Sequence, residues 1–235
     1  MELSRKLSEG VGAWLQFQYA CNNSDLFCEQ FLIEPIGRIL SSTTTDRVIA
    51  EYQHPVFAPM QSGPGRRPSV DFVVCEPYPI VRYAVETKWI GKTKPSVQSI
   101  LWDLIRLEQI AHTDGATCFF IIGGKKGSLD AYFSSEAFRG PKGLDPGKPL
   151  LNYKKNNKFE LDLSGSVVHR RKMVKNVLAS FQEHPFPHRI HARRTNPFPE
   201  GCKVNQFQIY VWEITAKPNR DVFYPKNSKH YAVRS

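Results

Sequence analysis

The stretch Val70-Asp71-Phe72-Val73-Val74, followed after a turn by Tyr83-Ala84-Val85-Glu86-Thr87-Lys88-Trp89, decides the fold of this chain. Both segments are rich in β-branched and aromatic residues, which favours two neighbouring β-strands. Side chains two residues apart in a strand point to the same face. Glu86 and Lys88 therefore project together, and a hairpin between the strands would bring Asp71 beside them.

Charged side chains are costly to bury without partners, so two of them on an apolar strand need an explanation. A divalent-metal site is one explanation, because hard cations such as Mg²⁺ take oxygen ligands and two carboxylates with waters make a usual set. Asp71 and Glu86 would hold the metal, and Lys88 would add positive charge beside a water and a phosphate. The alternative is an ion pair between Glu86 and Lys88 on a solvated sheet face, which contributes little to stability.

Asp71, fourteen further residues and then Glu86-Thr87-Lys88 resemble the catalytic motif of the PD-(D/E)xK nuclease superfamily, which has the restriction-endonuclease-like fold. Val70 stands before the aspartate where the motif has proline, and Pro68 lies three positions upstream of Asp71. The resemblance covers roughly residues 25–125. It implies catalytic roles for Asp71, Glu86 and Lys88, Mg²⁺ as cofactor with Mn²⁺ as an alternative, and hydrolysis of phosphodiester bonds, with DNA as the expected substrate.

The fold class that this resemblance implies is α/β, with a restriction-endonuclease-like core in which helices flank a central mixed β-sheet. Residues 1–125 are predicted to form the nuclease-like core with its N-terminal helices. Residues 126–235 are predicted to form a basic C-terminal extension that packs on the core. Alternating apolar residues between 205 and 214 predict a strand that the extension adds to the sheet.

Several other segments have clear local patterns. Residues 24–41 predict a helix that Pro35 would kink or interrupt. Ser96 is typical of a helix N-cap, and the amphipathic helix that follows is expected to run to about His112. The apolar run 117–122 predicts a buried strand, followed by a basic turn at 123–127. The proline-rich stretch 184–200 is expected to be irregular.

A third metal ligand is expected from a glutamate, because nucleases of the fold resembled often carry one on the helix before the first strand. Glu34 is the first choice there, since it lies nearer the end of the helix, and Glu29 is the second. Glu51, on the predicted first strand at residues 46–53, could reach the same site. The sequence does not decide between Glu34 and Glu51, and a solvated helix glutamate is the alternative explanation of Glu34.

The net charge of +10 favours a polyanionic partner, of which nucleic acid is the commonest, although a generally basic soluble protein has the same charge. Asp103 and Arg106 are also expected to form an exposed ion pair one helical turn apart. The alternative, which the nuclease resemblance implies, is that these polar residues of the helix lie near the site. The candidate nucleic-acid-binding residues are the basic side chains around the predicted site: Arg66, Arg67, Lys92, Lys94 and Arg106.

The five cysteines show no metal-ligand spacing, and Cys75 and Cys118 are expected to be small buried hydrophobes. With no membrane-spanning apolar run and no signal peptide at the start, a cytoplasmic location is expected. The alternative to a nuclease is a non-catalytic nucleic-acid-binding or scaffold protein that keeps a nuclease-like fold. The sequence leaves a homodimer open.

Overall fold

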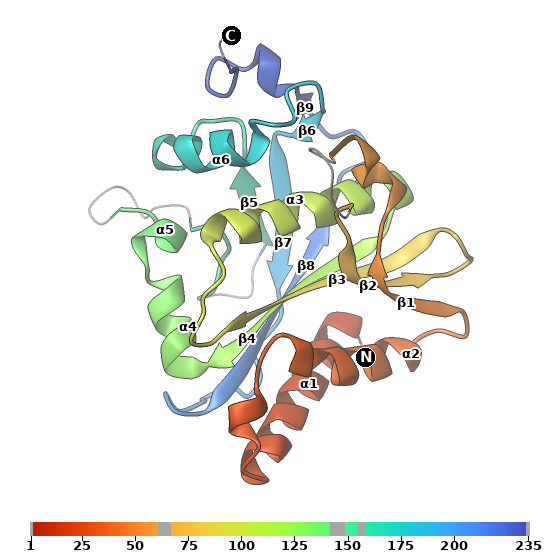
Figure 1. Cartoon of the computed structure of the whole chain (residues 1–235), viewed down its shortest axis with the longest axis vertical. Coiled ribbons are helices and arrows are strands. Elements are labelled where there is room, and N and C mark those ends of the chain that lie inside the picture. The colour runs from red at the N-terminus through yellow and green to blue at the C-terminus, as the bar shows by residue number, and fades with distance from the viewer. Residues whose placement is uncertain (1, 61–66, 142–148, 155–157, 234–235) are drawn as a thin grey trace.

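A mixed seven-stranded β-sheet forms the centre of the computed structural model, which describes residues 2–60, 67–141, 149–154 and 158–233. The strand order is β1-β2-β3-β4-β8-β7-β5, in which β3 and β4 are parallel and the other neighbours antiparallel (Figure 1). The strands are β1 (Arg47–Tyr52), β2 (Val70–Cys75), β3 (Val81–Ile90), β4 (Thr117–Lys125), β5 (Lys158–Asp162), β7 (Arg189–Arg194) and β8 (Phe207–Thr215). Two short strands, β6 (Phe186–Pro187) and β9 (Val222–Phe223), pair separately.

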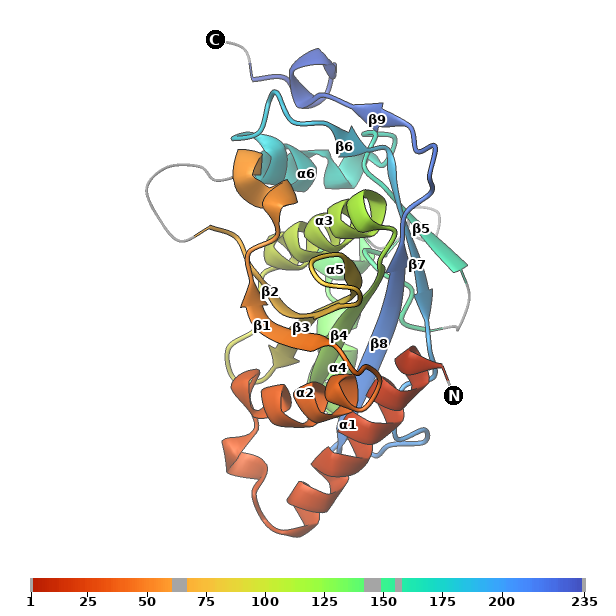
Figure 2. The same cartoon turned by 90° about the vertical axis from the view of Figure 1, so that its right-hand side faces the viewer.

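Helices cover both faces of the sheet, with α3 on one face and α1 and α2 on the other (Figure 2). The α-helices are α1 (Leu3–Ala20), α2 (Ile33–Ser41), α3 (Val97–Asp114), α4 (Lys126–Phe133), α5 (Glu136–Arg139) and α6 (Arg171–Leu178). Short 3₁₀ turns lie at Ser24–Leu26, Gln30–Leu32, Pro55–Met60, Val168–Arg170 and Pro225–Asn227. Helices on both sides of a mixed sheet bear out the α/β class. None of the helices in the described ranges is long and apolar enough to cross a lipid bilayer.

The alternation of side chains along β3 decides where its charges point. Ala84 and Ile90 pack in the apolar cluster that contains α3, whereas Val85 packs in the cluster that contains α1 and α2. Because residues two apart share a face, Glu86 and Lys88 lie on the side of Ala84 and Ile90. Both charged side chains therefore point toward α3.

The helix α3 has the ends that its sequence predicts. Ser96 is the N-cap, and its side-chain oxygen accepts a hydrogen bond of 3.0 Å from the backbone N–H of Ser99. The helix ends at Gly115, whose φ of 69° lies in the left-handed region that favours glycine. The helix is thus fixed at both ends above the centre of the sheet, where it carries charged residues toward β3.

Residues 24–41 do not form the single helix that was predicted. The chain makes two 3₁₀ turns, at Ser24–Leu26 and Gln30–Leu32, before α2 begins at Ile33. Pro35 lies in the first turn of α2, where proline is tolerated because an N–H at that position has no partner within the helix. The proline therefore sits at the start of a helix and does not kink one.

The predicted basic turn at 123–127 is also wrong, because β4 continues through both glycines to Lys125. A Cβ atom on Gly123 would lie 2.8 Å from the ring of Trp89 and 2.8 Å from Cδ1 of Ile209. A Cβ atom on Gly124 would lie 2.7 Å from the carbonyl oxygen of Ile90. Both glycines therefore serve close packing within a strand.

The stretch from residue 126 onward supplies β5, β7 and β8 to the central sheet. The strand predicted at 205–214 is confirmed as β8, which pairs with β4 from Cys118↔Ile214 to Lys125↔Phe207. The expectation of an irregular stretch at 184–200 is wrong in part, because Arg189–Arg194 forms β7. This six-residue run contains no proline, so each of its residues keeps a backbone N–H for pairing. Cys75 and Cys118 are fully buried and free, as predicted.

Candidate active site

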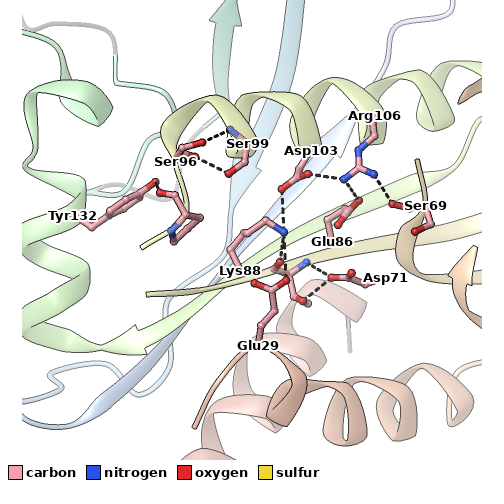
Figure 3. A network of polar contacts seen from close by, with 12 residues as sticks. Glu29, Ser69, Asp71, Glu86, Lys88, Ser96, Ser99, Asp103, Arg106 and Tyr132 are labelled. Atoms are coloured by element: carbon pink, nitrogen blue, oxygen red, sulfur yellow. Dashed lines mark hydrogen bonds and ion pairs between the residues drawn. The ribbon is translucent and has the colours of Figure 1, made fainter. Parts of the chain in front are cut away.

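Six charged side chains gather around β3 and the face of α3 above it. Figure 3 shows five of them linked by ion pairs, with the sixth, Asp71, bonded to Thr87 beside Lys88. We call this group the charged cluster; its members are Glu29 from the segment before the Gln30–Leu32 turn, Asp71 from β2, Glu86 and Lys88 from β3, and Asp103 and Arg106 from α3. Residues from four segments that are distant in sequence thus meet at one point.

Asp71 is held where β2 and β3 stop pairing. The pairing register of these strands ends at Phe72↔Val85. Just beyond it, Oδ2 of Asp71 accepts hydrogen bonds from the backbone N–H of Thr87 at 2.7 Å and from its hydroxyl at 2.6 Å. Burial raises the pKa of the Asp71 carboxyl, although these bonds and the nearby Lys88 lower it. The side chain thus replaces a backbone partner and is fixed against β3.

Glu86 is almost completely buried, with 1% of its surface exposed, and contacts a cation from α3. Its Oε1 lies 2.7 Å from Nη2 of Arg106, which also lies 2.5 Å from Oδ1 of Asp103. Another nitrogen of Arg106 donates to the carbonyl oxygen of Ser69. Burial, with Asp103 adding to it, raises the pKa of Glu86 well above its ordinary value, and Arg106 opposes this shift.

Lys88 lies at the centre of the charged cluster. Its Nζ is 3.2 Å from Oδ2 of Asp103 and 3.5 Å from Oε1 of Glu29, and it donates to the carbonyl oxygen of Thr87 at 2.9 Å. Burial by itself would lower the pKa of Lys88. Asp103 first and then the other three carboxylates outweigh burial and raise that pKa above its ordinary value. The lysine is therefore a cation at neutral pH.

The charged cluster has more negative than positive groups. Its four carboxylates face two cations, which leaves an excess of two negative charges when every group is ionised. Burial raises the pKa of the Glu29 carboxyl as it does those of Asp71 and Glu86, so several carboxylates are held at a cost. An additional cation at this point would lower that cost.

The oxygen atoms present fit a hard divalent cation. Oε1 of Glu86 and Oδ2 of Asp103 are buried and, despite their contacts with cations, receive no hydrogen bond of good geometry from the described residues. Carboxylate oxygens with free lone pairs are the ligands that Mg²⁺ prefers. Within the described ranges, no three His, Cys, Asp or Glu side chains are already arranged to hold a metal ion. A metal on Asp71 and Glu86, the pair that the nuclease motif implies, would need waters for the rest of its shell, with Asp103 as the nearby carboxylate that has a free oxygen.

The glutamate that the structure brings to the charged cluster is Glu29, the second choice from sequence. Glu34, the first choice, is exposed on α2 and forms an ion pair of 2.9 Å with Arg38. Glu51 is exposed on β1 with a φ of 52°, and its Oε2 accepts a hydrogen bond of 3.3 Å from the hydroxyl of Ser69. The chain is extended at Phe27, between the two 3₁₀ turns, and Glu29 follows this break, so it is not part of a helix that continues into α2.

The basic candidates fall into three groups. Lys92 and Lys94 are exposed in the loop after β3, and Arg67 is exposed before β2. Arg66 lies outside the described residues. The side chain of Arg106 is 10% exposed and lies against Glu86 and Asp103, so its guanidinium is engaged by carboxylates.

The ion pair predicted between Asp103 and Arg106 exists, but the prediction that it is exposed is wrong. Only 5% of the Asp103 side chain is accessible. Asp103 was therefore not named among the site residues, although the alternative, with polar residues of this helix near the site, fits its position. One signal was available, since the neighbouring residues Leu101, Leu104, Ile105 and Leu107 are apolar and predict a largely buried stretch of helix.

No protein-family model, curated protein or solved structure matches the chain.

Proposed function

We propose that the protein is a metal-dependent nuclease with a restriction-endonuclease-like core, which hydrolyses phosphodiester bonds, most directly those of DNA. The observation that carries this proposal is the charged cluster, in which Asp71, Glu86 and Lys88 lie together with an excess of carboxylates. A structural ion pair would need one carboxylate for each cation. Four carboxylates around two cations are better explained by a site that receives positive charge.

Asp71 and Glu86 would hold Mg²⁺, with Mn²⁺ as the alternative ion. When bound, the ion would lower the pKa of a water and offset charge on the phosphate. Lys88 would donate hydrogen bonds to that water and to a phosphate oxygen, and its raised pKa favours this role over acceptance of a proton. Asp103 and Arg106 are positioning residues, because Asp103 contacts Lys88 while Arg106 contacts Glu86.

One observation favours a second candidate, a non-catalytic nucleic-acid-binding or scaffold protein. Arg106 already lies 2.7 Å from Glu86, so this carboxylate has a cation without any metal. A chain that uses the cluster only to hold α3 on the sheet would keep this contact. It would bind Mg²⁺ weakly and would show no turnover.

The test is cleavage of plasmid and of single-stranded DNA in Mg²⁺ or Mn²⁺ by the wild type, Lys88→Ala and Lys172→Ala. Lys172 is an exposed lysine of α6, so its variant removes the same charge away from the cluster. The proposal expects metal-dependent cutting that Lys88→Ala loses and Lys172→Ala keeps. Absence of cutting on every substrate, with no heat of Mn²⁺ binding in calorimetry, would leave the scaffold candidate.

A further inference from the structure

A groove of about 1070 Å³ opens beside the charged cluster. One wall is the segment from Ser24 to Glu29, and the other is the chain from Lys88 to Pro95 at the end of β3. Lys125, at the end of β4, and Phe207, at the start of β8, complete it. The groove is therefore lined by residues from the N-terminal, middle and C-terminal parts of the chain.

Three lysines give the groove its charge. Lys92, Lys94 and Lys125 line it, all three are exposed, and none makes an ion pair or a side-chain hydrogen bond with another described residue. The acidic lining residues are Asp25 and Glu29, and Glu29 already contacts Lys88. Three lysines without carboxylate partners are suited to a ligand that carries several negative charges.

Aromatic rings form an apolar part of the same groove. The rings of Phe27 and Phe207 lie 4.6 Å apart between centroids, and Trp89 stacks on Phe207 at 5.9 Å. Each of the three residues keeps 9% of its surface exposed, and all three line the groove. A ligand there would meet apolar edges between the lysines.

The groove reaches the charged cluster at one end. Lys88 and Glu29 line it, and their side chains are 15% and 40% exposed. Glu86 and Asp103 lie behind them, with exposures of 1% and 3%. A phosphate that lies along the groove thus meets Lys88 first.

We propose that this groove binds one strand of a single-stranded nucleic acid, with its phosphates on Lys92, Lys94 and Lys125. The inference rests on the proposed function in one respect, which is that the scissile phosphate of the bound strand would lie at Lys88. Single-strand sites combine a basic groove with aromatic side chains against which bases pack. A duplex keeps the faces of its bases stacked inside, where aromatic side chains cannot pack against them, so it would leave the aromatic part of the groove unused.

The experiment measures binding without cleavage. Fluorescence anisotropy with labelled oligo-dT, oligo-U and a duplex, each of about 15 nucleotides, is recorded in EDTA at several salt concentrations. The variants compared are wild type, a groove triple variant and a control triple variant. The groove triple variant carries Lys92→Gln, Lys94→Gln and Lys125→Gln.

The control triple variant removes the same charge from another surface. It carries Lys172→Gln, Lys175→Gln and Lys229→Gln, which are exposed residues on and beyond α6. In Figure 1, α6 lies at the opposite end of the molecule from the end of α1, which leads into the Ser24–Glu29 wall. Any effect of net charge alone would therefore appear equally in both triple variants.

The expected result is tighter binding of an oligonucleotide than of the duplex, and at least about a tenfold loss of that affinity in the groove variant alone. Each phosphate contact to a single strand contributes about 0.7 to the magnitude of the slope of log affinity against log salt. The groove variant lacks three such contacts, so the magnitude of its slope should be smaller by about 2. The oligo-dT and oligo-U arms distinguish a DNA strand from an RNA strand. Preference for the duplex, equal losses in both triple variants, or no binding by the wild type would overturn the proposal.

Failure of the groove and failure of the nuclease proposal remain distinguishable. If the wild type cuts DNA but the groove variant binds normally, the groove inference is wrong and the nuclease proposal stands. If neither the wild type nor any variant cuts DNA, but the groove variant alone loses affinity for the oligonucleotide, the groove is a binding site and the nuclease proposal is wrong.

Discussion

Arg106 Nη2 lies 2.7 Å from Oε1 of Glu86, and the two residues are 9% and 1% exposed. The contact joins α3 to β3 in the middle of the protein. Removal of one partner from a buried ion pair leaves an uncompensated charge, which costs more than the intact pair contributes. The pair therefore makes the packing of α3 on the sheet depend on both residues.

We expect Arg106→Met to lower the free energy of unfolding by about 3–5 kcal/mol, because Glu86 and Asp103 lose their shared cation. Urea denaturation followed by circular dichroism measures this loss. Arg38→Met is the control, since Arg38 pairs with Glu34 on the surface and its loss should change stability by no more than about 0.5 kcal/mol. Equal losses in the two variants would show that burial of the Arg106 pair has no energetic consequence.

Glu29 and Glu34 give a direct test of which glutamate serves the site. Glu29→Gln should reduce DNA cleavage by about 10–100-fold, because its carboxylate lies 3.5 Å from Lys88 and lines the groove. Glu34→Gln should leave cleavage unchanged, since Glu34 pairs with Arg38. Initial rates at saturating Mg²⁺ provide the measurement, with thermal melting to verify the fold. A larger loss in Glu34→Gln would contradict the assignment of Glu29.

Glu108 predicts a pH dependence of stability. The residue is 1% exposed on α3, and burial raises the pKa of its carboxyl from 4.5 to about 7, although Arg220 opposes this. A carboxyl whose pKa is raised in the folded state stabilises the protein below pH 4.5, and that contribution is lost as the pH rises through 7. Relative to Glu108→Gln, the wild type should lose about 3 kcal/mol over this window.

Urea denaturation of wild type and Glu108→Gln at a series of pH values measures the difference. The variant also leaves Arg220 without its carboxylate, which lowers stability by an amount that does not vary with pH in this range. The slope of the difference against pH is therefore the informative quantity. A difference that stays constant from about pH 4 to about pH 8 would contradict the raised pKa.

Replacement of two glycines by alanine is expected to change the free energy of unfolding in opposite directions. Gly123→Ala should lower the free energy of unfolding by about 1–3 kcal/mol, since its Cβ atom would lie 2.8 Å from the Trp89 ring. Gly37→Ala should raise it by about 0.5–1 kcal/mol, because Gly37 lies inside α2 and its nearest neighbour would be 3.6 Å away. Thermal or urea denaturation measures both. Stabilisation by Gly123→Ala would rule out the close-packing role.

The strands and the main helix could be predicted from sequence because their signals are local. Asp71, Glu86 and Lys88 lie on strands of strong β-propensity, and Ser96 and Gly115 bound α3 in a way that the sequence shows. Their meeting at one point follows from alternation and one hairpin. These elements need no knowledge of distant parts of the chain.

The remaining features depend on contacts between distant segments. Glu29 lies against Lys88 in a segment where the chain makes 3₁₀ turns, whereas Glu34 was preferred because it lies nearer the end of the single helix predicted there. The glycine pair that begins at Gly123 is typical of a turn. In the structure, the Trp89 ring and Ile209 lie so close to Gly123 that only a residue without a Cβ atom fits. The burial of Asp103 depends on the sheet below α3. Local propensity contains none of this information.

The pairing of β4 with β8 also sets an order of events during synthesis. Cys118 pairs with Ile214, so β4 leaves the ribosome long before its neighbour exists. Until residues 207–215 emerge, β4 has an unpaired edge of apolar residues, the kind of edge at which nascent chains associate wrongly. Phe207 arrives in the same segment, so closure of the sheet and completion of the groove are one step. A nascent chain that stops before this point would be prone to aggregate and would lack Phe207 from the groove.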